Sequence, residues 1–173
     1  METGLVLTIP NADPVVDGWR QRFDPGAAAG MPAHVTLIYP FRELERLDAG
    51  DRERLARVIA DFRPFELSFS SVRRFEDEGI LWLAPEPADL IDQLMTSIVA
   101  AFPEHPPFGG RFETVIPHLT VAHADPETLT GIEKALASVQ IRQKIWAVSL
   151  FGRTDDGWRE LERFALGPSR GAG

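Results

Sequence analysis

The chain has 173 residues, 44% of them hydrophobic and 25% charged, as in a soluble globular domain, and it has no cysteine, which excludes disulfides, thiolate metal sites and a cysteine nucleophile. The formal net charge is −8, which disfavours binding along duplex nucleic acid, because its phosphate backbone attracts basic proteins. The apolar runs are too short to span a bilayer, so we expect a cytoplasmic protein with no membrane partner.

The first half of the chain alternates strand and helix patterns. Runs rich in apolar and β-branched residues predict strands, and apolar residues at helical spacing predict helices. Asp13-Pro14 has the form of an N-cap followed by proline at the first helical position. The expected elements are a strand at 4–10, a helix from Asp13, a flexible loop at 24–30, a strand at 34–41, a helix at 51–63, and strands at 65–76 and 79–84.

The second half repeats this order of patterns. The expected elements are a helix at 88–102, a loop at 103–117, a strand at 118–123, a helix capped by Asp125-Pro126, and strands at 140–153 and 158–166. The order of strand, helix, histidine-bearing strand, helix and long strand therefore occurs twice, which indicates a duplicated α+β unit. We expect one domain over 1–173, with lobes of about 1–77 and 78–173 and the two histidine-bearing strands side by side in the middle.

Two segments stand at equivalent places in the repeat: HVTL beginning at His34 and HLTV beginning at His118. Side chains alternate between the faces of a strand, so each histidine shares a face with the threonine two residues later, Thr36 or Thr120. The apolar residues of each segment would pack beneath helices, and the polar pair would face an open cleft. Two such pairs could act on a single ligand.

Histidine is the side chain best suited to proton transfer near neutral pH. One neutral imidazole could take a proton from the attacking oxygen while the other, protonated, gives one to the leaving oxygen. The hydroxyls of Thr36 and Thr120 could bind the phosphoryl oxygens, so this scheme needs no metal and no cofactor. A metal hydrolase is disfavoured, since threonine stands where a second ligand on each strand face would be needed.

The paired motifs resemble those of the 2H phosphoesterase superfamily, and the flanking segments MPAHVTLIYPF at 31–41 and PPFGGRF with PHLTVA within 106–122 resemble its bacterial 2′-5′ RNA ligase-like members. The resemblance covers nearly the whole chain. It implies an α+β, bilobal fold in which two antiparallel-sheet lobes, with outer helices and strands exchanged between them, surround a central cleft. It also implies His34, Thr36, His118 and Thr120 as the catalytic residues.

The same resemblance implies metal-independent chemistry on a 2′,3′-cyclic phosphate, a 1″,2″-cyclic phosphate or a 2′,5′-linkage, carried by a nucleotide or an RNA terminus. For ring opening by water, analogy with parts of the family makes His118 the base and His34 the acid. We expect the protein to be a monomer. A module of the same fold that binds a nucleotide or RNA end without turnover is the alternative, although binding alone would not require two titratable groups.

Other residues near the motifs carry weaker signals. Phe108 and Arg111, in the loop before the second motif, could stack on a base and hold a phosphate, or could equally be packing and surface residues. His105 lies in the same loop, where a solvated histidine is expected. Odd spacing from His118 places His123 on the opposite face of its strand, as packing or surface. By the same alternation, Tyr39 and Phe41 are expected on the core side of theirs.

Overall fold

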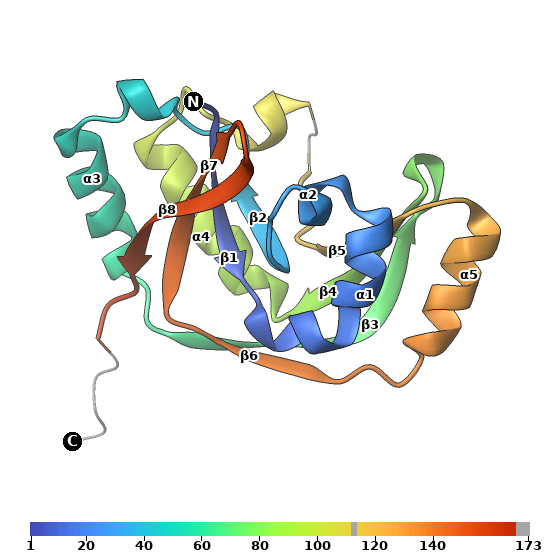
Figure 1. Cartoon of the computed structure of the whole chain (residues 1–173). Helices are drawn as coiled ribbons and strands as arrows, with labels where there is room; N and C mark the ends of the chain where they lie inside the picture. The colour runs from blue at the N-terminus through green and yellow to red at the C-terminus, as the bar shows by residue number, and fades with distance from the viewer. Residues whose placement is uncertain (112–113, 169–173) are drawn as a thin grey trace, which may run out of the picture.

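The computed structural model describes residues 1–111 and 114–168 and has an α+β architecture with two four-stranded antiparallel sheets (Figure 1). The first sheet has the strand order β2 (His34–Ile38), β1 (Thr3–Thr8), β7 (Ala147–Thr154), β8 (Gly157–Ala165). The second sheet has the order β5 (Leu119–His123), β4 (Ile80–Glu86), β3 (Phe65–Phe75), β6 (Ile141–Ile145).

Helices cover the outer sides of the two sheets (Figure 1). They are α1 (Asp13–Phe23), α2 (Pro25–Ala28), α3 (Ala49–Ala60), α4 (Ala88–Ala101) and α5 (Pro126–Ala135), with short 3-10 turns η1 (Pro10–Ala12), η2 (Leu44–Arg46), η3 (Glu76–Glu78) and η4 (Pro107–Gly110). In Figure 1, α3 and α5 lie at opposite ends of the molecule, and β6 runs between these ends along the lower edge. Helix α1 contacts β5 and helix α4 contacts β2, so each motif-bearing strand is supported by a helix from the other half of the chain.

Local sequence explains where several elements begin and end. Helix α3 starts at a capping box. The Asp48 side chain accepts a hydrogen bond from the backbone N–H of Asp51, and the Asp51 side chain accepts one from the backbone N–H of Asp48. Asp125 caps α5 in the expected manner. The β3–β4 connection ends at Gly79, whose φ of +63° suits a residue without a Cβ.

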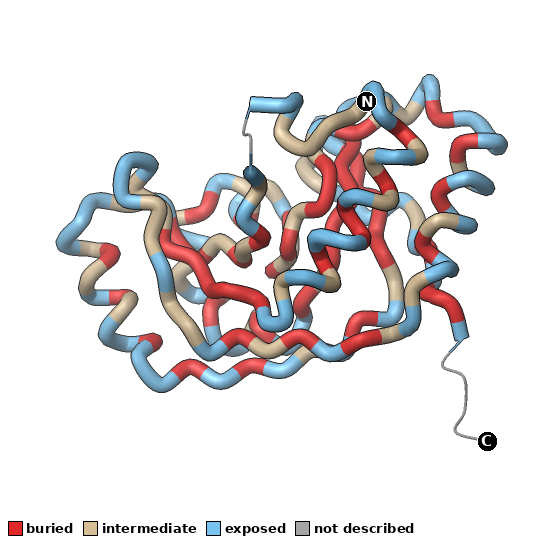
Figure 2. The backbone as a smooth tube through the Cα atoms, turned by 180° about the vertical axis from the view of Figure 1, so that it is seen from behind, coloured by how far each residue is buried: buried red, intermediate tan, exposed pale blue. Residues whose placement is uncertain are grey.

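One hydrophobic cluster includes residues from both sheets, with Val35 and Leu37 of β2 and Leu119 and Val121 of β5 fully buried in it. The backbone coloured by burial shows buried segments concentrated in the interior and alternating with exposed residues along the outer helices (Figure 2). The apolar members of both motifs therefore anchor their strands in the core, and the polar members are left at its edge.

Two expectations about the strands were wrong. The stretch 140–153 is two strands, because the chain leaves the edge of the second sheet after Ile145 and enters the first sheet at Ala147, and no turn residue marks this change of partner. Strand β2 ends at Ile38, before Pro40, which has no N–H for a ladder. The two motif-bearing strands contact each other, as expected, and each is the edge strand of its own sheet.

The region between α1 and β2 also differs from the prediction. Asp13 is inside the first turn of α1, because the 3-10 turn η1 precedes it, and its carboxylate accepts from the Ala33 backbone N–H at 3.1 Å. The stretch 24–30 contains the short helix α2, whose N-cap is Asp24. Part of the expected loop 103–117, residues 112–113, and the C-terminal residues 169–173 lie outside the described residues.

Candidate functional site

Each motif-bearing strand contains a β-bulge at the same position of its motif. In the pairing of β1 with β2, Leu37 is the extra residue that has no partner on β1. In the pairing of β4 with β5, Val121 is the extra residue that has no partner on β4. A bulge places two consecutive side chains on one face. Leu37 and Ile38 are accordingly both buried, as are Val121 and Ala122.

The bulges reverse the alternation for the residue that follows them. Tyr39 lines the same cavity as His34 and Thr36, so the expectation that Tyr39 faces the core was wrong. His123 lines the same cavity as His118, so its placement on the opposite face was also wrong, although it is exposed as expected. Phe41, beyond the strand, is buried as predicted.

Both motif histidines are held by the same backbone contact. His34 Nδ1 lies 2.8 Å from the carbonyl oxygen of Pro32, and His118 Nδ1 lies 2.8 Å from that of Ile116. A carbonyl oxygen can only accept, so Nδ1 carries the proton in each ring. The Nε2 atom is then a lone-pair acceptor in the neutral imidazole and a donor in the protonated one, as a base or an acid requires.

Burial lowers the pKa of both imidazoles. The pKa of His34 falls to about 4, with burial as the main cause, opposed by the Pro32 carbonyl and assisted by the charges of Arg20 and His118. The pKa of His118 is also lowered, chiefly by burial, while the carboxylate of Glu78 acts in the opposite direction. Both rings are therefore mainly neutral at pH 7 in the absence of a ligand.

Two adjoining cavities flank the facing edges of β2 and β5. A cavity of about 280 Å³ is lined by His34, Thr36 and Thr120, and another of about 320 Å³ by His118 and Thr120. Thr120 belongs to both, so it marks their junction. The structure thus gathers all four motif residues around this junction, although the sequence alone did not indicate that they come from two sheets.

The two histidines have different surroundings. His118 lies against two aromatic rings, with Phe75 at 5.1 Å and Trp82 at 5.9 Å between ring centroids, both edge-on. These rings stack on each other at 4.8 Å and hold the imidazole on one side. Sequence reasoning missed both residues, because nothing in the β3–β4 segment links it to the second motif.

An ion pair lies beneath the His34 side of the site. Arg20 is 1% exposed, and its Nη2 donates to Asp24 Oδ2 at 3.1 Å and to the Met31 carbonyl at 2.9 Å. These bonds tie α1 to the segment that leads into His34. Asp24 also caps α2 and lines the 280 Å³ cavity, so the stretch expected to be a flexible loop is a fixed wall of the site.

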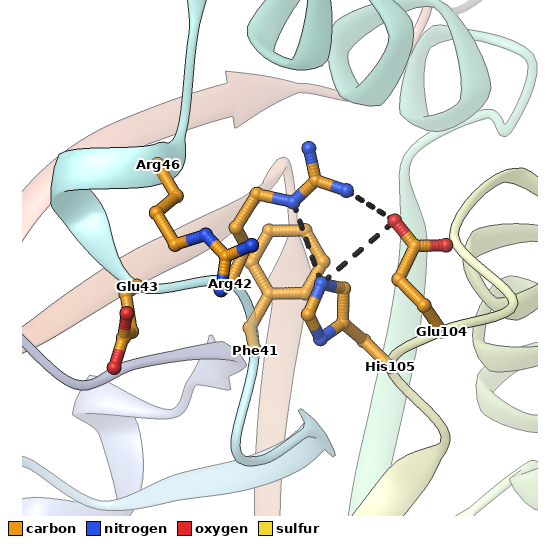
Figure 3. Close-up of a pocket in the computed structure, with 6 residues that line it drawn as sticks. All are labelled: Phe41, Arg42, Glu43, Arg46, Glu104 and His105. Carbon is orange, nitrogen blue, oxygen red and sulfur yellow. Dashed lines mark hydrogen bonds and ion pairs between the residues drawn. The ribbon is translucent and has the colours of Figure 1, made fainter.

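The remaining sequence candidates divide between two places. Phe108 and Arg111 line the 320 Å³ cavity with His118, within reach of a ligand there. His105 does not reach either motif cavity. It lies in a separate cavity of about 480 Å³, where Arg42 Nε donates to its Nε2 at 3.4 Å and Glu104 is an ion-pair partner of Arg42 (Figure 3).

Metal-ligand clusters and membrane-spanning helices are both absent from residues 1–111 and 114–168. No three His, Asp or Glu side chains in these ranges are grouped as ligands for a metal ion. None of the helices in these ranges is both long and apolar enough to cross a membrane.

Comparison with known proteins gives consistent matches over most of the chain. The model of the 2′-5′ RNA ligase superfamily matches residues 9–157. A Geobacillus kaustophilus (strain HTA426) protein described as a phosphoesterase is 26% identical over 178 residues, which cover 96% of this chain and 97% of that protein.

Solved structures resemble the fold over nearly the whole chain. A Thermus thermophilus protein, TT0787, has a TM-score of 0.65 at 18% identity and covers 98% of this chain and 100% of its own. Escherichia coli LigT in complex with NADP⁺ has a TM-score of 0.59 at 16% identity, with coverage of 96% and 98%. LigT has also been solved with 3′-AMP and with ATP. These likenesses confirm the α+β fold with two antiparallel sheets.

Proposed function

Because the chain belongs to the 2′-5′ RNA ligase superfamily, within the two-histidine phosphoesterases, we propose that it acts on a cyclic phosphate or a 2′,5′-phosphodiester of a nucleotide or RNA end without a metal. The observation that carries this proposal is the matched pair of imidazoles. His34 and His118 each have Nδ1 fixed by the carbonyl two residues earlier, which leaves Nε2 for proton transfer, and each ring lines a cavity that Thr120 also lines.

The proposed reaction is an in-line displacement at phosphorus. One imidazole Nε2 takes a proton from the attacking water or hydroxyl as its oxygen bonds to phosphorus. The bond from phosphorus to the ribose oxygen breaks, and the other imidazole, which entered protonated, gives its proton to that oxygen. Thr36 and Thr120 donate to the non-bridging oxygens, where negative charge grows in the transition state. The two histidines exchange protonation states, so the reverse direction forms the diester.

The strong lowering of the pKa of His34 in the free protein favours His34 as the base and leaves His118 as the acid. Binding of an anionic phosphate between the rings raises the pKa of both. Burial, the main cause at both rings, lowers the pKa of His34 to about 4, so this ring stays neutral and can accept a proton. The pKa of His118 is also lowered by burial, while the Ile116 carbonyl and the Glu78 carboxylate raise it, so an anionic ligand can bring this ring to its protonated form. This is the reverse of the assignment that family analogy gave, and the near-symmetry of the site leaves the substrate orientation to decide between them.

Several features of the chain support a nucleotide as the ligand. Phe108 and Arg111 line the cavity beside His118, which suits an aromatic base and a phosphate. LigT, which shares the fold, has been solved with 3′-AMP, ATP and NADP⁺. We propose a cytoplasmic monomer in which residues 1–173 form a single two-lobed domain with the phosphate held between the lobes.

A nucleotide- or RNA-end-binding module of the same fold is the second candidate. It would need the threonines and the cavities but not two imidazoles that can transfer protons. Turnover distinguishes the two, and the experiment is a screen of 2′,3′-cyclic nucleotides, ADP-ribose cyclic phosphate and 2′,5′-linked dinucleotides in EDTA. We expect turnover of at least one class, with loss in both His34→Ala and His118→Ala. Binding without turnover in every class would favour the binding module.

A further inference from the structure

The cavity on the His34 side has an aromatic wall that the proposed chemistry does not use. Trp158 lies there with its ring 5.8 Å from that of Tyr39 in an edge-on arrangement. It packs on a small cluster of Val6, Met31 and Phe151, apart from the main core. A partly buried indole on the wall of the cavity that His34 lines is suited to packing against a nucleobase.

A cation completes this wall. The guanidinium of Arg153 lies 5.9 Å from the centroid of the Trp158 ring. The Tyr39 hydroxyl on the same wall donates to a carboxylate oxygen of Glu2 at 2.5 Å. Arg153 is exposed and forms no ion pair within residues 1–111 and 114–168. In a protein with a net charge of −8, an arginine at the cavity without a carboxylate partner favours an anionic group of the ligand.

The backbone holds this wall in place against the His34 side of the site. Trp158 N–H donates to the Ala29 carbonyl at 2.7 Å, which joins the β7–β8 hairpin to the segment after α2. Gly157 makes the close approach possible, because a Cβ there would meet the Ala29 oxygen at 2.3 Å, and its φ of +116° also favours glycine. The aromatic wall is therefore built before a ligand arrives, which lowers the ordering cost of binding.

The sizes of the two cavities indicate which part of a ligand each of them could hold. The volume of about 320 Å³ is at the lower end of the range of about 300–1,000 Å³ found for small-molecule pockets, and that of about 280 Å³ is just below it. Each cavity therefore suits one nucleoside rather than a whole dinucleotide. A phosphate at Thr120, where the cavities meet, can carry substituents into both.

From these observations we propose a second nucleotide subsite on the His34 side, in which Trp158 packs against a nucleobase and Arg153 binds a second phosphate beyond the scissile one. The proposal rests on the proposed function, since it places the scissile phosphate at the motif residues. The second subsite would favour a nucleoside that carries two separate phosphates, or a phosphodiester with a further nucleotide on the His34 side, over a nucleoside monophosphate.

Calorimetry with three probes tests the subsite: inorganic phosphate, adenosine 3′-monophosphate and adenosine 3′,5′-bisphosphate. We expect Arg153→Ala to weaken binding of the bisphosphate by about tenfold, as for loss of one charge-assisted pair, with the other two probes within about twofold. Arg153→Lys should restore part of the loss. Trp158→Ala should weaken both nucleotides but not inorganic phosphate, and Trp158→Phe should retain most of the affinity.

Arg159→Ala is the matched control. Arg159 is an exposed arginine on the same hairpin, it pairs with Asp156 at 3.2 Å, and it does not line the cavity. Its loss should leave all three affinities unchanged. Equal weakening of all probes by Arg153→Ala, no weakening of the bisphosphate, or no nucleotide binding by the unaltered protein would overturn the subsite. The proposed function is judged separately, by turnover in EDTA.

Discussion

Replacing His34 by glutamine should make the protein relatively more stable as the pH falls. In the unfolded chain this histidine titrates near 6.5, whereas burial in the folded protein lowers its pKa to about 4. The unfolded state therefore binds a proton in this window that the folded state does not. Wild-type stability due to this group is complete above pH 6.5 and is lost as the pH falls towards 4.

The magnitude follows from the same two values. A lowering from 6.5 to about 4 amounts to roughly 3 kcal/mol when fully expressed, and about 2 kcal/mol of this appears between pH 7 and pH 5. Urea unfolding of both proteins at pH 7, 6 and 5 measures it. The free energy of unfolding of His34→Gln, relative to wild type, should rise by about 2 kcal/mol over this range.

Thr36→Val is the control for this experiment, because it alters the same face of β2 without removing a titratable group. Its stability relative to wild type should stay constant over the same pH range. If His34→Gln and wild type show the same pH dependence, His34 is not held neutral by burial, and the assignment of His34 as the base loses its support.

Other consequences of the structure can be measured independently. Asp24→Asn leaves the buried guanidinium of Arg20 without its nearest counter-charge and should lower the free energy of unfolding by about 3–5 kcal/mol. Adding Arg20→Met to this variant should recover part of the lost stability. A change below about 1 kcal/mol in urea unfolding would contradict the buried ion pair. Activity on a cyclic nucleotide should be unchanged in EDTA, and loss restored by zinc or manganese would favour a metal mechanism. With bis(p-nitrophenyl) phosphate, whose leaving group departs without a proton, His118→Ala should retain more activity than His34→Ala; the opposite order would exchange base and acid.

The sequence predicted the fold class and the motif residues because both depend on local patterns. Apolar periodicity located the helices, and the duplicated order indicated two similar units. The sequence did not predict how the strands pair. The chain passes through Trp146 from one sheet into the other, and no turn residue marks the change. Which sheet a strand joins depends on contacts with residues far away in the chain, and no local sequence pattern encodes those contacts.

The errors of sequence-based prediction at the site have a similar physical origin. Alternation placed His34 and Thr36 on one face correctly, but one extra residue in the strand reverses the face of everything after it. Tyr39 and His123 were misplaced for this reason, and HVTLI and HLTVA contain no glycine or other residue that announces a bulge. Trp158 and Arg153 come from the far end of the chain, so only the three-dimensional structure brings them to His34.

The central claim is that His34 and His118 act as one unit on a single phosphate. The most direct measurement is the rate of cyclic-phosphate hydrolysis by His34→Ala, His118→Ala and the double variant. We predict that each single replacement lowers kcat by roughly 10²–10⁴-fold, and that the double variant loses far less than the product of the two effects, because the two groups serve one transition state. A wild-type rate in either single variant, or fully multiplicative losses in the double variant, would contradict the account.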